Sequence, residues 1–421
     1  MTHETKPTEI LLVEDAKFYR SVIKSQLEKQ LGFVVACAET LQEADEILEE
    51  RADDFFLALL DLNLPDAPNG EIVEHVMKKN IPSVVFSGHF NEEMRDDLMQ
   101  KRIIDYVLKD SPASIEYVIS TVKRLYQNQF VKVLLVDDSK TARFQMGELL
   151  NRYKFQVVEA KDGLEGLEVL ANNPDVKLVI TDYNMPNLDG FEFTKKIRTQ
   201  YSKRELSIIG VSTYGNHALS AKFIKVGAND FITKPFLNEE FFCRVSQNVE
   251  IIDYINAMKE SVVTDYLTGL KNRRYFYERG LQMFKESQEG NGYLIAAMMD
   301  LDGLKTVNDT YGHDCGDEIL RHAASKLRQH FANIGVVTRF SGGEFCAIMY
   351  RDGTEDIIEF FENIRHEIET TPLHYTNQQV KTSISIGVTW QNTENLDDLV
   401  NLCERFLLKA KEQGGNKVVV G

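Results

Sequence analysis

Long apolar segments are missing from this 421-residue sequence, and no stretch approaches the roughly 18 apolar residues that a membrane-spanning helix needs. The N-terminal stretch MTHETKPTE is polar and shows no cleavable signal. Basic residues are also in the minority, because 48 Lys and Arg face 65 Asp and Glu and leave a formal net charge of −17. Such a charge repels phosphate backbones. We therefore expect a cytoplasmic protein that acts on neither a membrane nor a nucleic acid.

Cysteine is scarce, and its pattern excludes two classes of protein. The five cysteines are odd in number, scattered along the chain and free of the paired spacing of a metal site: Cys37, Cys243, Cys315, Cys346 and Cys403. In a cytoplasmic protein such residues are reduced thiols. We expect neither a disulfide framework nor a cysteine-bound metal.

An internal repeat fills the first part of the chain, whose length predicts about three domains in total. Four words of the first copy recur 121 to 125 residues later: ILLVEDAKFYR (10–20) as VLLVDDSKTAR (133–143), LALLDLNLPDAPNG (57–70) as LVITDYNMPNLDG (178–190), SVVFSG (83–88) as IIGVST (208–213), and IDYVLKD (104–110) as NDFITKP (229–235). In each copy, short apolar runs alternate with stretches of helical periodicity. This alternation predicts βα units and a parallel sheet.

Polar residues gather where the apolar runs end, which is the edge at which open α/β sheets place their sites. Each copy supplies an acidic pair, a third aspartate, a hydroxyl residue and a lysine: Glu14, Asp15, Asp61, Ser87 and Lys109 in the first, and Asp137, Asp138, Asp182, Ser212 and Lys234 in the second. Three carboxylates at one edge repel one another unless a cation lies among them, and hard oxygen ligands suit Mg²⁺. An aspartate held beside Mg²⁺ and a lysine is a plausible nucleophile for a phosphoryl group.

On these residues each repeat resembles a response-regulator receiver domain from end to end, which implies a flavodoxin-like, doubly wound parallel sheet. The resemblance makes Asp61 and Asp182 the phosphate acceptors, served by a histidine kinase or a phosphotransfer protein. It gives the metal site to the acidic pairs, the acceptors and the carbonyls of Asn63 and Asn184. Ser87 and Ser212 would follow the phosphate and Lys109 and Lys234 would pair with it, together with the aromatic partners Tyr106 and Phe231.

The two copies differ near their acceptors. The first has one extra residue in LPDAPNG, and Asp110 stands where the second has Pro235. The loops around Asp61 are therefore less regular, and Asp182 is the better-supported acceptor. That the first copy only mediates dimer contacts remains an alternative.

A helix is predicted after Pro235. Its apolar residues follow a three-four spacing that gives one stripe: Phe242, Val245, Val249, Ile252, Ile255, Met258 and Val262. Such a stripe is usually core, here the last helix of the second repeat packed on its own sheet. Its continuation over residues 251–264 without Gly or Pro suggests a stalk that pairs across a homodimer.

From Asp265 onward, five words occur in a fixed order: DYLTGLKNRRYF, YLIAAMMDLDGLKTVNDTYGHDCGDEIL, VVTRFSGGEFCAIMY, SISIGV and CERFLLKAKEQGGNKV. Their order resembles the GGDEF family of diguanylate cyclases over residues 265–421, which implies an α+β fold of the polymerase-palm type. In that family two GTP molecules, one held by each domain of a dimer, condense to cyclic di-GMP. The domains would then be receivers at 8–128 and 130–250, a connector at 251–264 and the GGDEF domain at 265–421.

By this resemblance, Asp300 and the carbonyl of Leu301 would bind Mg²⁺. The nucleotide would be held by residues that contact its phosphates or read guanine: Lys305, Asn308, Asp317, Gly342 of the hairpin and Lys411. A turn followed by a helix start is the alternative interpretation of NDTYGHDCGD.

The hairpin RFSGGEF departs from the family at its centre. The chemistry needs carboxylates to hold metal ions against the triphosphate, and the second acid falls on Gly343, which has no side chain. Glu344 is one residue away, and in an extended segment this shift should aim its carboxylate away from Asp300. Two further losses are Gly415, in place of a phosphate-binding arginine, and Ala332 with Gly335, in place of the Arg-x-x-Asp product-inhibition motif.

Three functions remain open. The first is a phosphorylation-controlled response regulator with a degenerate cyclase domain that keeps guanine nucleotide. The second is an active diguanylate cyclase that recruits Glu344 or Asp302 for the metal. The third is an interaction protein that binds no nucleotide.

Overall fold

The computed structural model describes residues 9–88, 98, 103–213, 217–290, 292–376 and 378–421. The expectations for the N-terminal stretch and for a domain start at residue 8 rest on residues 1–8, which lie outside these ranges. The chain divides into two compact units, residues 1–253 and 254–421. None of the helices in the described ranges has both the length and the apolar character to cross a membrane.

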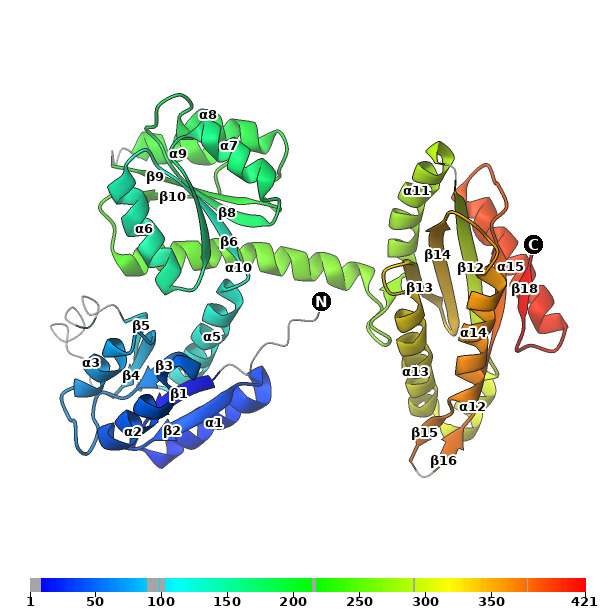
Figure 1. Cartoon of the computed structure of the whole chain (residues 1–421), viewed down its shortest axis with the longest axis horizontal. Coiled ribbons are helices and arrows are strands. Elements are labelled where there is room, and N and C mark those ends of the chain that lie inside the picture. Colours follow the sequence, from blue (N-terminus) through cyan, green and yellow to red (C-terminus); the bar gives the residue numbers. More distant parts are fainter. Residues whose placement is uncertain (1–8, 89–97, 99–102, 214–216, 291, 377) are drawn as a thin grey trace. The chain divides into compact units, whose positions relative to one another are not determined.

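The first receiver contains a parallel sheet with the strand order β2-β1-β3-β4-β5. Its strands are β1 (Glu9–Val13), β2 (Val34–Ala38), β3 (Phe55–Leu60), β4 (Ser83–Ser87) and β5 (Asp105–Leu108). Every residue of β3 and β4 is buried, as expected of strands covered on both faces. The covering helices include α1 (Lys17–Leu31), α2 (Leu41–Arg51), α3 (Glu71–Lys78) and α5 (Pro112–Asn128), with the short 3₁₀ segment Ala52–Asp54 before β3 (Figure 1).

The second receiver repeats this sheet with the order β7-β6-β8-β9-β10. Its strands are β6 (Lys132–Val136), β7 (Gln156–Ala160), β8 (Val176–Asp182), β9 (Ser207–Ser212) and β10 (Asp230–Thr233). Its helices are α6 (Lys140–Arg152), α7 (Gly163–Asn172), α8 (Gly190–Arg198), α9 (His217–Val226) and α10 (Asn238–Val263). Both sheets have the flavodoxin order 2-1-3-4-5, so the predicted fold of the two repeats is confirmed.

The two receivers lie in one unit because they share part of an apolar core. One cluster joins Phe33 and Ile104 of the first receiver to Phe155 and Val133 of the second. Tyr153 adds a polar contact, since its Oη donates to the carbonyl oxygen of Ile104 over 3.1 Å.

The predicted helix after Pro235 is present as α10, which has 26 residues. Its first half is core, because Phe241, Val245, Val249 and Ile252 are buried. Met258 and Val262 of the same apolar stripe are exposed. The stripe therefore serves the receiver core only as far as residue 252.

The second unit is built on a mixed sheet with the order β11-β13-β14-β12-β17-β18. Its strands are β11 (Lys271–Asn272), β12 (Tyr293–Asp302), β13 (Gly335–Ser341), β14 (Glu344–Arg351), β17 (Ser383–Thr389) and β18 (Val418–Val420), and β15 (Leu373–Tyr375) pairs with β16 (Gln378–Val380) outside it. Its helices are α11 (Arg273–Glu289), α12 (Leu304–Tyr311), α13 (His313–Phe331), α14 (Ile357–Thr370) and α15 (Leu396–Glu412), as Figure 1 shows.

Strand β12 separates the two cores of this unit. Its residues Ile295, Ala297 and Met299 belong to one apolar cluster, and the alternate residues Ala296 and Met298 belong to another. This period-two alternation is that of a strand buried on both faces. The mixed sheet with helices agrees with the predicted α+β palm-type fold.

Candidate phosphoacceptor and nucleotide sites

The first receiver brings its acidic residues and its lysine together at the carboxyl edge of the sheet. Glu14 follows β1, Asp61 follows β3 and Lys109 follows β5. Backbone ladder bonds hold these positions, since the Asp61 amide donates to the Val13 carbonyl over 2.9 Å. The Nζ of Lys109 lies 2.6 Å from Glu14 Oε2 and 2.6 Å from Asp61 Oδ2, and all three side chains are buried. The single positive charge of the lysine is thus shared by two buried carboxylates and offsets only one of their two negative charges.

The donor set of this receiver fits a small hard cation. Carboxylate oxygens of Glu14, Asp15 and Asp61 lie within 4.8 Å of one another. Burial raises the pKa of Glu14, although its bond with Lys109 opposes that shift. A cation bound among these oxygens would favour the ionised form that burial disfavours. Over the part of the chain that the structure describes, no other three His, Cys, Asp or Glu side chains meet the same distance limit.

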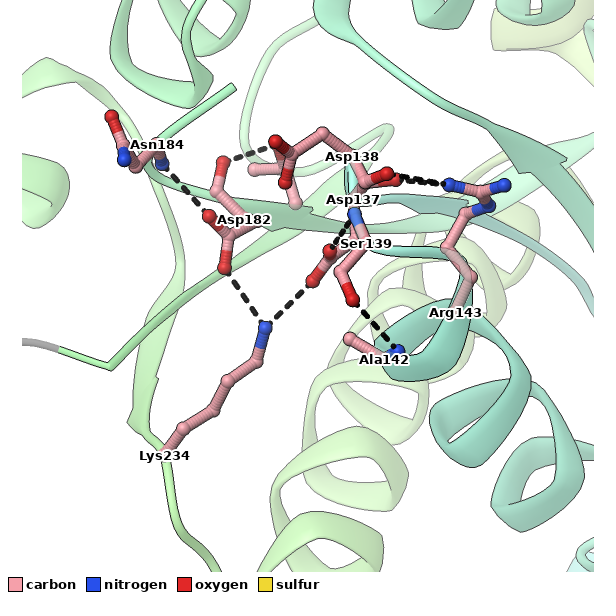
Figure 2. Close-up of polar contacts among 9 residues, drawn as sticks. Asp137, Asp138, Ser139, Ala142, Arg143, Asp182, Asn184 and Lys234 are labelled. Atoms are coloured by element: carbon pink, nitrogen blue, oxygen red, sulfur yellow. Dashed lines mark hydrogen bonds and ion pairs between the residues drawn. The ribbon is translucent and has the colours of Figure 1, made fainter. Parts of the chain in front are cut away.

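The second receiver has the same arrangement around Lys234, as Figure 2 shows. The Nζ of Lys234 lies 2.6 Å from Asp137 Oδ2 and 2.9 Å from Asp182 Oδ1. The other oxygen of Asp182 accepts from the backbone N–H of Asn184 over 2.8 Å. Burial raises the pKa of Asp182 even though Lys234 lowers it. Asp138 is exposed, and the carboxylates of Asp137, Asp138 and Asp182 are not grouped as closely as the three of the first receiver.

The hydroxyl and aromatic residues lie on the neighbouring strands. Ser87 and Ser212 are buried and are the last residues of β4 and β9. Tyr106 of β5 has a raised pKa, chiefly because of burial, and its hydroxyl hydrogen-bonds with Ser87. Phe231 of β10 packs against Phe223, with ring centroids 5.6 Å apart. The structure therefore brings together each hydroxyl residue, acceptor and lysine that the sequence singled out.

Sequence reasoning missed one arginine in each receiver. Arg20 Nη1 donates to the Glu14 carbonyl over 2.7 Å, and Arg143 Nη1 donates to the Asp137 carbonyl over 2.6 Å (Figure 2). Each arginine also bonds a glutamate, Glu39 or Glu159. These bonds fix the backbone that presents the acidic pair. The signal was available, because both repeat words ILLVEDAKFYR and VLLVDDSKTAR end in arginine.

In the second unit, a cavity of about 520 Å³ collects several of the predicted nucleotide residues. Of these, Asp300, Leu301, Lys305 and Asn308 line it, and the remaining lining residues are Gly303, Leu304, Asp309, His313 and Gly343. Asp317, Gly342 and Lys411 do not line the cavity. Lys411 instead forms an ion pair with Asp300, and Asn308 packs against Gly316, the neighbour of Asp317.

Gly343 faces this cavity. A Cβ at Gly343 would lie 3.1 Å from Asp300 Oδ1 and 2.9 Å from Leu304 Cδ2. A side chain at this position would therefore be directed at Asp300. The hairpin itself is held in place, because Arg339 donates to the Gly342 carbonyl over 2.8 Å and pairs with Asp265 at 3.1 Å.

The expectation that Glu344 faces away from Asp300 is wrong. Asp300 and Glu344 are direct partners in the antiparallel ladder of β12 and β14. Residues directly opposite in such a ladder project from the same face of the sheet. Strand alternation does not extend to Gly343, which lies in the turn before β14, and the register across the sheet decides which residue is opposite Asp300. Glu344 does not line the cavity, and its carboxylate accepts from the Ser341 hydroxyl.

Asp302, the other candidate replacement acid, is already bonded elsewhere. Its oxygens accept from Ser383 Oγ over 2.7 Å and from Ser385 Oγ over 2.6 Å. The Asn416 amide donates to it over 2.9 Å. Asp302 therefore holds the C-terminal loop against β17. Together with Gly343, this leaves Asp300 without a second free carboxylate beside the hairpin. Among the described residues of the third domain no three His, Cys, Asp or Glu side chains are grouped closely enough to hold a resident divalent cation by themselves, so these residues do not fit one.

Two family models match the chain. The model described as "Response regulator receiver domain" matches residues 10–119 and 133–246, and the model described as "Diguanylate cyclase, GGDEF domain" matches residues 262–417. The matched receiver segments make up more than half of the chain.

Curated and solved relatives match parts of this chain. "Response regulator PleD" of Caulobacter vibrioides is 29% identical over 299 residues, a match that covers 68% of this chain and 65% of PleD, which is less than two thirds of its length. "Uncharacterized protein YhcK" of Bacillus subtilis is 33% identical over 158 residues, which cover 37% of this chain and 44% of YhcK. A crystal structure titled "putative two-component system response regulator/ggdef domain protein" is 38% identical, covers 58% of this chain and 99% of its own, and superposes with a TM-score of 0.53. The chain therefore belongs to the response regulator family and carries two receiver domains followed by a C-terminal GGDEF domain.

Proposed function

We propose that this response regulator accepts phosphoryl groups on Asp182 and Asp61 from a histidine kinase or phosphotransfer protein. Its output is a GGDEF domain of cyclic di-GMP signalling that keeps guanine nucleotide but has lost most or all cyclase activity. Two observations support the receiver part: both acceptors lie at a carboxyl strand edge, and each is bonded to its own lysine.

The receiver chemistry follows from the contacts of Asp182. Its carboxylate is the nucleophile, and Lys234 bonds one oxygen while the Asn184 amide bonds the other. Bound Mg²⁺ supplies positive charge that offsets the charge developing on the transferred phosphoryl group. Asp137, Asp138 and Asp182 would hold it in the second receiver, as Glu14, Asp15 and Asp61 would in the first. After transfer, Lys234 pairs with the new phosphoryl oxygens and Ser212 follows them, which changes the contacts around Phe231.

One observation supports the hypothesis that the third domain has lost most or all cyclase activity. The position from which a side chain would reach Asp300 belongs to Gly343, where an added Cβ would lie 3.1 Å from Asp300 Oδ1. Removing a preorganised electrostatic group typically lowers a rate by about 10² to 10³. The loss of the arginine at Gly415 weakens the hold on phosphate further.

A cyclase assay tests this proposal. The purified chain is activated with acyl phosphate and incubated with GTP and Mg²⁺, and cyclic di-GMP is quantified by chromatography. We expect no product above an Asp300→Ala control. Product well above that control would reject the degenerate assignment.

A second candidate, an active cyclase, has one observation in its favour. Glu344 is the direct cross-strand partner of Asp300, so a change of side-chain rotamer away from Ser341 would bring the two carboxylates together. If the assay yields product, Glu344→Gln should abolish it. Asp302→Asn should instead lower stability, because Asp302 bonds the C-terminal loop.

A cytoplasmic homodimer is part of the proposal. The exposed apolar residues Ile251, Tyr254 and Met258 on α10 support a helix that pairs with a second copy. Size-exclusion chromatography with light scattering on Met258→Glu tests this pairing. A monomer only in the variant supports it, and an unchanged oligomeric state contradicts it.

A further inference from the structure

The ion pair between Asp300 and Lys411 gives the third-domain cavity an unusual charge balance. Asp300 Oδ2 accepts from Lys411 Nζ. Asp300 Oδ1 faces the place that a Cβ would occupy at position 343. The lysine comes from the last turn of α15, 111 residues further along the chain. Asp300 is therefore neutralised by a residue of the chain itself at the end of the cavity where the hairpin lies.

The acids on the hairpin side of Asp300 are already bonded, and Asp309, which lines the same cavity, forms no close group of three acids with Asp300 among the described residues. Glu344 accepts from Ser341, and Asp302 is occupied by Ser383 and Ser385. With an acid at position 343, two carboxylates would face each other and require a cation between them. With glycine there and Lys411 on Asp300, the formal charges of this end of the cavity already cancel.

Lysine is suited to be the counter-charge of Asp300 because of the number of hydrogen-bond donors that it carries. An ammonium group has three donors and no acceptor, so Lys411 can bond Asp300 and still offer donors to a phosphate oxygen. Lys305 lines the cavity and supplies one cation, and Lys411, which does not line it, supplies a second through its contact with the lining residue Asp300. A polyphosphate entering here meets two ammonium groups, and the charge of Asp300 is already compensated.

We propose that this cavity binds guanosine triphosphate without a divalent cation, because Lys411 takes the place of the metal ion as the counter-charge of Asp300. The inference rests on the proposed retention of guanine nucleotide and deepens it. The domain would then sense the free nucleotide and would not share the metal requirement of a cyclase.

Calorimetry on the full-length chain tests the inference, with GTP titrated once in excess EDTA and once in excess Mg²⁺. We expect the two dissociation constants to agree within about threefold. In Gly343→Glu, which restores the second carboxylate, we expect binding at least about tenfold tighter in Mg²⁺ than in EDTA, the range of effect that metal-ligand changes produce. The same titrations in a chain carrying Asp15→Asn and Asp138→Asn confine any effect of Mg²⁺ to the third domain.

A double-mutant cycle separates a counter-charge from a simple phosphate contact. Lys411→Met should weaken binding in EDTA by about tenfold or more, since it exposes the phosphate to an uncompensated Asp300. If the lysine offsets Asp300, the loss should be clearly smaller in the Asp300→Asn background. Lys409→Met is the matched control: Lys409 is two residues away on α15, lies over the Phe406 ring and should leave binding unchanged. Thermal denaturation checks that each variant is folded.

The outcomes are distinct. Binding at least about tenfold tighter in Mg²⁺ for the wild-type chain, or equal effects of Lys411→Met in both backgrounds, would overturn the inference and leave nucleotide retention intact. Absence of GTP binding under both conditions would overturn nucleotide retention and the inference with it. Equal affinities with a background-dependent lysine effect would establish both.

Discussion

Lys234 Nζ lies 2.9 Å from Asp182 Oδ1 at the carboxyl edge of the second receiver sheet. The nucleophile therefore carries its own counter-charge before any phosphoryl group arrives. The first receiver has the same relationship between Lys109 and Asp61, at 2.6 Å. Because the two copies are equivalent in this respect, we expect both to accept phosphate, although the sequence favoured Asp182.

Phosphoryl labelling tests the two acceptors separately. With acyl phosphate and Mg²⁺, intact-mass spectrometry should find up to two phosphoryl groups on the wild-type chain, one on Asp61→Asn or Asp182→Asn, and none on the double variant. Asp175→Asn is the control, since this exposed aspartate pairs with Lys132 outside the site. If Asp182→Asn alone removes all labelling, the first receiver has only a structural role.

The stability of the acceptor site should depend on pH with a defined sign. Burial raises the pKa of Asp182 above its value in the unfolded chain, and Lys234 opposes that shift only in part. A raised pKa means that the folded state holds the proton more tightly. The contribution of protonated Asp182 to the free energy of unfolding is therefore fully present below the pKa of the unfolded chain. It is lost as pH rises through the pKa of the folded chain.

Asp182→Asn removes the loss of stability that accompanies ionisation of the buried Asp182 carboxyl. We expect the variant to gain stability relative to wild type as pH rises above about 4, the ordinary pKa of an aspartate, in urea unfolding without Mg²⁺. Asp175→Asn should behave in the opposite way, because the bond with Lys132 lowers the pKa of Asp175. A stability difference between Asp182→Asn and wild type that does not change with pH would contradict the assignment.

Arg143 should support phosphorylation without touching the phosphoryl group. Its guanidinium bonds the Asp137 carbonyl and Glu159, so Arg143→Ala frees the backbone that presents the acidic pair. We expect unfolding free energy to fall by about 1 to 3 kcal/mol and the rate of Asp182 labelling to fall with it. Arg204→Ala, at an exposed position, should change neither. Normal labelling by a folded Arg143→Ala chain would exclude this positioning role.

Gly343→Glu should create or raise cyclase activity. The backbone of Gly343 is not in the left-handed region, and the closest obstacle is the flexible end of Leu304. Restoring a carboxylate beside Asp300 should raise product formation by about 10² over wild type. Gly343→Gln, of the same shape and without charge, is the control. No gain in Gly343→Glu would mean that the damage extends beyond the hairpin.

Adding Gly415→Arg to Gly343→Glu should raise cyclase activity less than the place of this arginine in the family motif suggests. Gly415 has φ +73°, and a Cβ there would lie 3.2 Å from Asp302 Oδ1. A side chain in the left-handed region costs about 1 to 3 kcal/mol. We expect the double variant to be less stable than Gly343→Glu in thermal unfolding. A higher melting temperature would show that the new guanidinium pairs with Asp302 strongly enough to offset the strain.

The sequence alone determined the domain order, the fold class and most of the residues that meet at the two candidate acceptor sites. Repeats of short apolar runs place acids, hydroxyls and lysines at strand ends, and parallel strands bring such ends to one edge. The missing acidic side chain at Gly343 could also be predicted, because the hairpin sequence matches the family motif without an insertion or a deletion. These features depend on local periodicity and composition, which a single sequence records.

The tertiary structure alone decided which side chains meet across long separations. The sequence predicted opposite directions for Gly343 and Glu344, but Gly343 lies in the turn before β14, and only the ladder register revealed that Glu344 lies opposite Asp300. The ion pair of Asp300 with Lys411 likewise joins residues 111 positions apart. Register and long-range contacts follow from how whole elements pack, and no short window of sequence specifies that packing.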